Sequence, residues 1–155
     1  GGMALDTFGK IDGADGFDGI DDNISIPSNS SLDAGWSEIT MEAWVKSGAD
    51  SQSQTIVLGK WRTNNPRSYE LGFDSAGNSQ LFAAVQVDGY LETAYGDVNP
   101  LVTGEWYHVV ATYKSGMLNL FVNGVEDATA SNSPNCGASC PAACETTASP
   151  PASSS

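Results

Sequence analysis

Positive charge is scarce in this sequence. Six lysines and arginines stand against 19 aspartates and glutamates, and the formal net charge is -13. Such an acidic surface repels a phosphate backbone, so nucleic acid and an anionic membrane surface are poor partners. Long apolar runs are lacking as well, because no stretch of about 18 apolar residues occurs, and this excludes a membrane-spanning helix. Calcium, neutral glycans and basic protein surfaces remain as candidate partners.

Cysteine is missing from most of the chain. The three cysteines, Cys136, Cys140 and Cys144, lie four residues apart near the C-terminal end. A zinc site would need a fourth ligand nearby, but the only histidine, His108, falls in a predicted strand far from them. The odd count predicts one disulfide within the chain and a thiol that bridges to a partner, or pairing with cysteines beyond this sequence. Idle reduced thiols are the alternative.

A helical hydrophobic period is also lacking, whereas apolar and polar residues alternate in several short segments. Between residues 39 and 46, for example, Ile39, Met41, Ala43 and Val45 share one face of a strand. We predict strands at 23–26, 39–46, 55–61, 68–73, 80–87, 90–95, 106–114, 117–123 and 125–130. The domain is therefore expected to be all-β.

Two-residue turns separate several of these segments, namely Asp88-Gly89, Ser115-Gly116 and Asn123-Gly124. Such pairs accept the positive φ of tight hairpins, so neighbouring strands are expected to pair antiparallel in a sandwich or barrel. The segment 106–114 carries bulky residues on both faces, which predicts a central strand covered on both sides. Alternation assigns the following residues to the core: Tyr69, Leu71, Phe73, Leu81, Ala83, Val85, Val87, Leu118, Leu120 and Val122.

Three regions follow from these patterns. Residues 1–16 are expected to form an N-terminal arm or edge strand, residues 17–130 one folded domain, and residues 131–155 a Cys/Ser/Pro-rich tail or linker. No charged-then-apolar leader opens the chain, so we expect a mature product, an excised fragment or an intracellular protein. Glycosylation sequons at Asn23 and Asn29, with the Ser/Thr-rich tail, favour an extracellular or cell-surface protein over sequons that arose by chance.

Aspartates recur every three residues among glycines in the sequence DGADGFDGIDD, which begins at Asp12. Short carboxylates on a backbone that bends freely suit Ca²⁺, which takes about six to eight oxygen ligands. The spacing does not fit an EF-hand, because alternate ligand positions are apolar and no glutamate occupies the twelfth position. Successive Asp-Gly turns are the alternative.

Three motifs together resemble a known family. FDGIDDNISIPSNSSLD, EITMEAWVK and TGEWYHVVATYKSGMLNLFVNGV are similar, in order and spacing, to laminin-G-like or concanavalin A-like domains over roughly residues 9–128. The resemblance implies a two-sheet antiparallel jelly-roll sandwich. It also implies calcium on the acidic turn, held by Asp18, Asp21 and Asp22, and sugar sites on the rim loops or the concave face.

The sequence departs from the family in two places. Asn23 replaces the aromatic residue that usually follows the FDG-x-DD turn, and the final strands, with an aspartate that helps to complete the calcium site, are lacking. A sheet edge without those strands exposes a row of backbone donors and acceptors. We therefore expect the N-terminal arm, or a strand from a neighbouring copy, to complete the sheet by strand complementation. A shortened domain with its edge covered by the tail is the alternative.

Catalysis is not expected. Glycoside hydrolases with a similar sandwich carry two carboxylates on one strand face, whereas Glu42 is the lone acid between residues 39 and 45. His108 lies inside a predicted strand and is interpreted as a packed or surface residue rather than as part of a catalytic triad.

Binding is better supported by the sequence. The segment GKWRTNNPR, from Gly59 to Arg67, gathers cationic, aromatic and amide side chains in an otherwise acidic chain. Its candidate ligand-binding residues are Lys60, Trp61, Arg62, Asn64, Asn65 and Arg67, and an ordinary exposed hairpin loop is the alternative. Flat aromatic faces that could stack on sugars also occur elsewhere, although most are expected to pack in the core or at a sheet edge. These are Trp36, Trp44, Tyr69, Tyr90, Tyr95 and Trp106.

Together these patterns predict a non-catalytic extracellular recognition or adhesion module that binds glycan or protein. The alternative is a structural subunit of an extracellular fibre or surface appendage, assembled by strand exchange and tail contacts.

Overall fold

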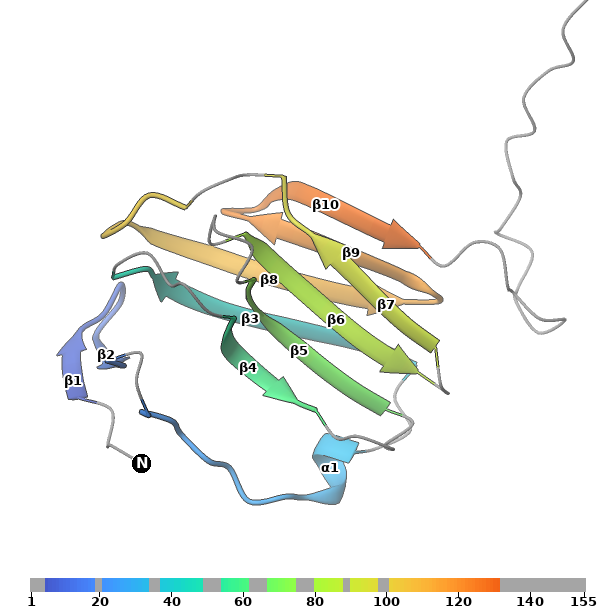
Figure 1. Cartoon of the computed structure of the whole chain (residues 1–155), viewed down its shortest axis with the longest axis horizontal. Coiled ribbons are helices and arrows are strands. Elements are labelled where there is room, and N and C mark those ends of the chain that lie inside the picture. Colours follow the sequence, from blue (N-terminus) through green and yellow to red (C-terminus); the bar gives the residue numbers. More distant parts are fainter. Residues whose placement is uncertain are drawn as a thin grey trace, which may run out of the picture.

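The described residues form two antiparallel four-stranded sheets that face each other (Figure 1). The structure is a computed structural model, and it describes residues 5–18, 21–33, 37–48, 54–61, 67–74, 80–87, 90–97 and 101–131. Three candidate ligand-binding residues, Arg62, Asn64 and Asn65, and the three cysteines lie outside these ranges. The predicted fold class, an all-β sandwich of two antiparallel sheets, is confirmed.

The first sheet has the strand order β10-β9-β8-β3. Its members are β3 (Glu38–Lys46), β8 (Trp106–Lys114), β9 (Met117–Val122) and β10 (Val125–Ser131). Two-residue turns join β8 to β9 and β9 to β10, whereas β3 pairs with β8 from far along the chain. Sequence alternation sets which side chains of β3 face inward, but only the β3–β8 pairing puts Trp44 opposite His108.

The second sheet has the order β4-β5-β6-β7. It contains β4 (Thr55–Lys60), β5 (Arg67–Phe73), β6 (Leu81–Val87) and β7 (Tyr90–Tyr95). A bulge between Ile56 and Leu58 interrupts the pairing of β4 with β5. The chain crosses from the first sheet to the second after β3, and returns after β7.

The hydrophobic core fills the space between the two sheets. Every residue that alternation assigned to the core lies in it or packs against it. Leu71, Leu81, Leu118 and Leu120 are fully buried, and burial of one such side chain stabilises the fold by about 1.5–3 kcal/mol. One expectation is wrong: β8 is central, but its outer face is only half-buried, because the second sheet covers its inner face alone.

The described N-terminal strands join neither of the two four-stranded sheets. Residues 1–16 contain a separate hairpin of β1 (Leu5–Phe8) and β2 (Gly13–Gly16), which pair with each other (Figure 1). The expectation that this arm completes the first sheet is therefore wrong for the described residues. The predicted strand at 23–26 is also wrong, because the described residues provide no ladder partner there and Ile24 and Ile26 stay exposed. A four-residue helix, α1 (Ser30–Asp33), follows.

One side of the sandwich is open. β10 lies against β7 on one side, whereas β3 and β4 on the other side touch only sparsely. A groove of about 600 Å³ runs along β3 from Glu38 to Glu42. Leu58 and Tyr69 of the second sheet and Ser31 and Leu32 of α1 complete its lining. Within the described ranges no helix is long and apolar enough to cross a membrane.

Candidate functional site

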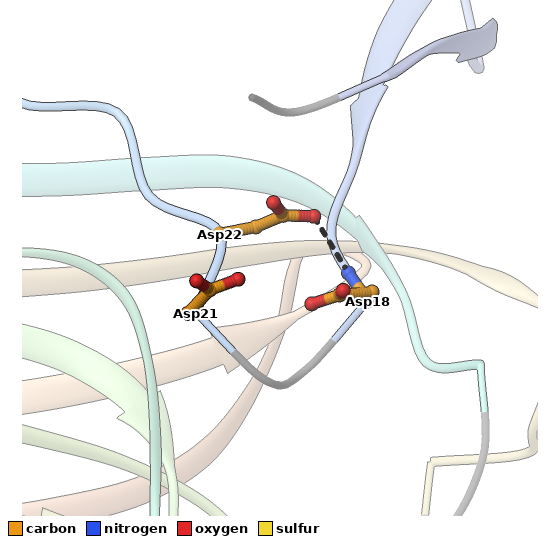
Figure 2. A group of neighbouring side chains, drawn as sticks. All are labelled: Asp18, Asp21 and Asp22. Atoms are coloured by element: carbon orange, nitrogen blue, oxygen red, sulfur yellow. Dashed lines mark hydrogen bonds between the residues drawn. The ribbon is translucent and has the colours of Figure 1, made fainter. Parts of the chain in front are cut away.

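Three aspartates meet on the loop that follows β2. Asp18 is the last described residue after β2. Asp21 and Asp22 are the first two described residues of the segment that leads to α1 (Figure 2). One carboxylate oxygen from each lies within 4.8 Å of the others. The backbone N–H of Asp18 donates a hydrogen bond of 3.0 Å to Oδ2 of Asp22, which holds the turn closed. The structure thus brings together the three residues that the family resemblance implied.

The donor set of this acidic turn fits calcium in chemistry and in spacing. Two oxygens bound to one Ca²⁺ at about 2.3–2.6 Å lie at most about 5 Å apart, and the three aspartates satisfy this limit. Asp18 and Asp21 are exposed and Asp22 is half-buried, so the carboxylates are open to solvent on one side. Three carboxylates supply fewer ligands than Ca²⁺ takes, and water would have to complete its shell.

Both sequon asparagines are exposed in the segment between β2 and α1. The side-chain amide of Asn23 donates to the carbonyl oxygen of Asp21 at 3.3 Å. Oδ1 of Asn29 accepts a hydrogen bond from the N–H of Ser31 at 2.9 Å, which caps the start of α1. Exposure makes both side chains reachable by a glycosylating enzyme.

The candidate loop at 59–67 is only partly described. Lys60 ends β4, where its ammonium donates to the Ser28 hydroxyl at 3.4 Å, and Trp61 follows with 44% of its surface exposed. Arg67 begins β5. Thus Lys60 ties the end of β4 to the segment before α1, and Trp61 remains available to solvent.

A second candidate surface lies on the outer face of the first sheet. Trp44 of β3 and His108 of β8 are directly opposite each other, with ring centroids 5.1 Å apart and planes tilted by 30°. Trp106 lies diagonally beside Trp44, because its own cross-strand partner is Lys46. We call Trp44, Trp106 and His108 the aromatic stripe. Trp44 keeps 41% of its surface exposed although it stands on a rigid strand.

Charged groups surround the aromatic stripe. Oε2 of Glu42 lies 3.6 Å from Nε2 of His108. The ammonium of Lys46 lies 5.2 Å from the ring centre of Trp106, and that of Lys10 lies 5.5 Å from the ring centre of Trp44. Lys10 comes from the turn between β1 and β2, so the hairpin reaches this face of the sandwich. The stripe therefore combines exposed aromatic surface with ammonium groups and a carboxylate.

From the sequence, Trp44 and Trp106 belong to the aromatic residues whose flat faces could stack on sugars, most of which were expected to pack in the core or at a sheet edge. The sequence did indicate the outward position of Trp44, because alternation places it on the face of its strand opposite the apolar residues. The position of His108 and Trp106 beside it depends on the pairing of two strands that are distant in sequence. No local pattern predicts that pairing.

Comparison with protein families gives an independent result. Residues 18–143 match a laminin-G-type family model of the concanavalin A-like lectin/glucanases superfamily. The comparison with curated proteins gave no match. The family match covers most of the chain and agrees with the two-sheet sandwich described above. The chain therefore belongs to the concanavalin A-like lectin/glucanases superfamily, and its sandwich is the jelly roll of that family.

Proposed function

We propose that this chain is a non-catalytic extracellular recognition or adhesion module that binds glycan, or a protein that carries it, through the aromatic stripe. The observation that carries the proposal is Trp44, which is exposed, stacked on His108 and held on a sheet strand. A flat aromatic face can cover the apolar C–H face of a pyranose ring. Because the strand fixes the ring before binding, little conformational entropy is lost on association.

The carboxylates on this face support a role without catalysis. Glu38 and Glu42 both point outward from β3 but are four residues apart, which corresponds to about 13 Å along a strand. Glycosidases place their two carboxyl groups within about 9.5 Å of each other. Glu38 pairs with Lys114 at 3.2 Å, and Glu42 faces His108. These two glutamates are therefore not placed to flank a single glycosidic bond.

A glycan array, with and without calcium, tests the proposal. The wild-type chain is expected to bind a small group of glycans, and Trp44→Ala is expected to abolish that binding. Trp61→Ala is the matched variant, because Trp61 is exposed to a similar degree but stands in the loop after β4. If Trp61→Ala loses binding and Trp44→Ala keeps it, the binding site lies in that loop instead. Failure of the wild-type chain to bind any glycan would overturn glycan recognition.

We also propose that Asp18, Asp21 and Asp22 hold one Ca²⁺. Support comes from their mutual spacing within 4.8 Å and from the repulsion among three neighbouring carboxylates, which a divalent cation would relieve. A cation that binds only the folded chain stabilises it by about 2.7 kcal/mol at a hundred times its Kd. It would fix the loop between β2 and the segment that carries both sequons.

Thermal melts in calcium and in chelator test this site. We expect calcium to raise the Tm of the wild-type chain by several degrees and to leave the Tm of Asp21→Asn nearly unchanged. Asp97→Asn, at an exposed aspartate beyond β7, serves as the control and is expected to respond as the wild type does. Equal melts of the wild-type chain in calcium and in chelator would remove the calcium proposal.

The open side of the sandwich supports a second candidate function, that of a structural subunit joined to copies of itself by strand exchange. Within the described ranges β3 pairs with β8 alone, and the groove beside it exposes the edge between Glu38 and Glu42. Ile39, Ala43 and Val45 are only half-buried there, although they face the core. An added strand would cover them and bond to the free edge.

Light scattering and negative-stain imaging distinguish the two functions. A structural subunit is expected to form a stable multimer or filament, and non-reducing gels are expected to show a ladder that collapses on reduction if Cys136, Cys140 or Cys144 links subunits. A monomer at all concentrations, with a single band on the gel, would exclude this second function and leave the recognition module.

A further inference from the structure

We propose that the aromatic stripe selects glycans whose sugar rings carry a carboxylate, that is, uronic acids. This inference rests on the proposed glycan-binding function and names the ligand class of that surface. It is carried by two lysines, Lys10 and Lys46, whose ammonium groups lie over the rings of Trp44 and Trp106.

The two lysines are unusual in their charge environment. The chain has a net charge of -13, so most of its cations are expected to find carboxylates, as Lys114 does with Glu38 at 3.2 Å on the same sheet face. Within the described residues, however, the partners of the Lys10 and Lys46 ammonium groups are aromatic rings rather than carboxylates. Both side chains are exposed. Two positive charges are thus held at the stripe, and neither forms an ion pair with a carboxylate of the described residues.

Stacking of a sugar on these rings has a consequence for the lysines. A pyranose ring that lies on Trp44 or Trp106 occupies the space above the indole and displaces the ammonium from it. A neutral sugar offers the displaced ammonium only hydroxyl groups. A uronic acid offers it a carboxylate on the sugar ring itself, and a charge-assisted hydrogen bond to that group is stronger than one to a hydroxyl. The surface therefore compensates for the lost cation–π contact only when the ligand is acidic.

The rest of the stripe is compatible with an anionic ligand. Glu42, the carboxylate nearest in sequence to Trp44 on this face, faces His108 and stands four residues from Lys46. Physiological salt screens charges that are more than about 8 Å apart, so acidic groups beyond that distance repel the ligand only weakly. The two ammonium groups then determine the local preference.

Titration of the full chain with trigalacturonate and with its fully methyl-esterified form, in physiological salt, tests the inference. The two probes have the same rings and linkages and differ in charge. Binding is followed by tryptophan fluorescence and checked by calorimetry. We expect the acid to bind at least about fivefold more tightly than the ester, because two exposed ion pairs each contribute a modest factor.

Four variants locate the effect. Lys10→Gln and Lys46→Gln are each expected to lower the affinity for the acid by about two- to fivefold and to leave the affinity for the ester unchanged. Lys114→Gln removes a cation from the same sheet face away from the stripe and is expected to change neither affinity. Trp44→Ala is expected to lower the affinity for both probes.

The outcomes separate the inference from the function on which it rests. Equal affinity for acid and ester, or a preference for the acid that survives in both Lys10→Gln and Lys46→Gln, would overturn the inference while the glycan-binding function stands. Absence of binding to both probes, together with an array on which the wild-type chain binds only neutral glycans, would also overturn the inference alone. An array without any bound glycan would overturn both.

Discussion

Gly72 illustrates, at the scale of one residue, how closely two strands approach. It stands in β5 opposite Ile56, next to the bulge in β4, and a Cβ at this position would collide with the backbone oxygen of Thr55. A backbone atom cannot rotate away as the end of a flexible side chain does. The lack of a side chain at Gly72 is therefore a requirement of the pairing between β4 and β5.

We predict that Gly72→Ala lowers the free energy of unfolding by about 2 kcal/mol or more, because the added methyl group forces β4 and β5 apart. Gly48→Ala is the matched control, since a Cβ there meets nothing within 4 Å, and its effect is expected to stay within about 0.5 kcal/mol. Urea denaturation of the three proteins measures both values. Equal stability of the two variants would contradict the close approach of β4 to β5 at Gly72.

A second residue, Glu70, links stability to pH. It points outward from β5 between Gly59 of β4 and Ala84 of β6, and burial raises the pKa of its carboxyl above the ordinary value of 4.5. The folded chain therefore binds more protons than the unfolded chain between pH 4.5 and the raised pKa. The stability that Glu70 contributes is fully present below this window and is lost as the pH rises through the raised value.

We predict that Glu70→Gln raises the Tm near neutral pH, where the charged carboxylate is only partly solvated, and that this gain disappears below about pH 4. Melts of the variant and the wild-type chain at neutral and acidic pH provide the comparison. Glu105→Gln, which changes an exposed glutamate, is expected to shift the Tm little at either pH. A gain of the same size at both pH values would show that desolvation of the charge is not its cause.

At the scale of one element, the two turns of the first sheet have the same backbone conformation but differ in their first residue. Ser115-Gly116 joins β8 to β9 with φ values of 50° and 80°, and Asn123-Gly124 joins β9 to β10 with 51° and 80°. Positive φ at both positions defines a turn whose twist matches that of the strands. Asn123 also accepts a hydrogen bond from the N–H of His108 at 3.0 Å through its Oδ1. The second turn is therefore anchored to β8, next to the aromatic stripe.

We predict that Ser115→Asn stabilises the chain by about 0.5 kcal/mol, because asparagine tolerates a positive φ better than serine does. The denaturation midpoint in urea should rise while the m-value stays constant. Gly124→Ala is the opposite case and is expected to cost about 1–2 kcal/mol, since alanine is strained at φ 80°. An unchanged midpoint for both variants would mean that the turns do not contribute to stability as their dihedral angles indicate.

At the scale of the whole molecule, the jelly roll is tight along β7 and β10 and open along β3 and β4. The acidic turn and both exposed sequons lie in the part of the chain between β2 and α1. For a secreted chain we predict that the intact mass exceeds the chain mass by hexose-containing increments, and that Asn23→Gln and Asn29→Gln each remove one. A bare mass for the chain isolated from its native source would contradict glycosylation at both positions.

Much of the fold was predictable because the relevant signals are local. The core residues of β5, β6 and β9 follow from the two-residue period of a strand, and the Ser115-Gly116 and Asn123-Gly124 pairs marked the hairpins that join β8, β9 and β10. The predicted strand at 23–26 was wrong because strand formation there depends on a distant partner rather than on a local signal. An alternating segment becomes a strand only if another strand offers it a ladder, and no sequence pattern states whether one does. The pairing of β1 with β2 was not predicted, because β2 consists of two glycines, an alanine and an aspartate, and glycine and aspartate are poor strand formers.

The candidate sites divide in the same way. The sequence by itself determined the all-β class, the inward and outward faces of β3, and the crowding of aspartates around Asp18, since each depends on residues close together in the chain. Only the tertiary structure decided that β3 pairs with β8 and leaves its other edge open within the described ranges. It also decided that Trp44 meets His108 and that Lys10 reaches Trp44 from a separate hairpin. The physical reason is that contacts between distant segments depend on register and sheet order, which are set by the packing of the whole sandwich rather than by local pattern.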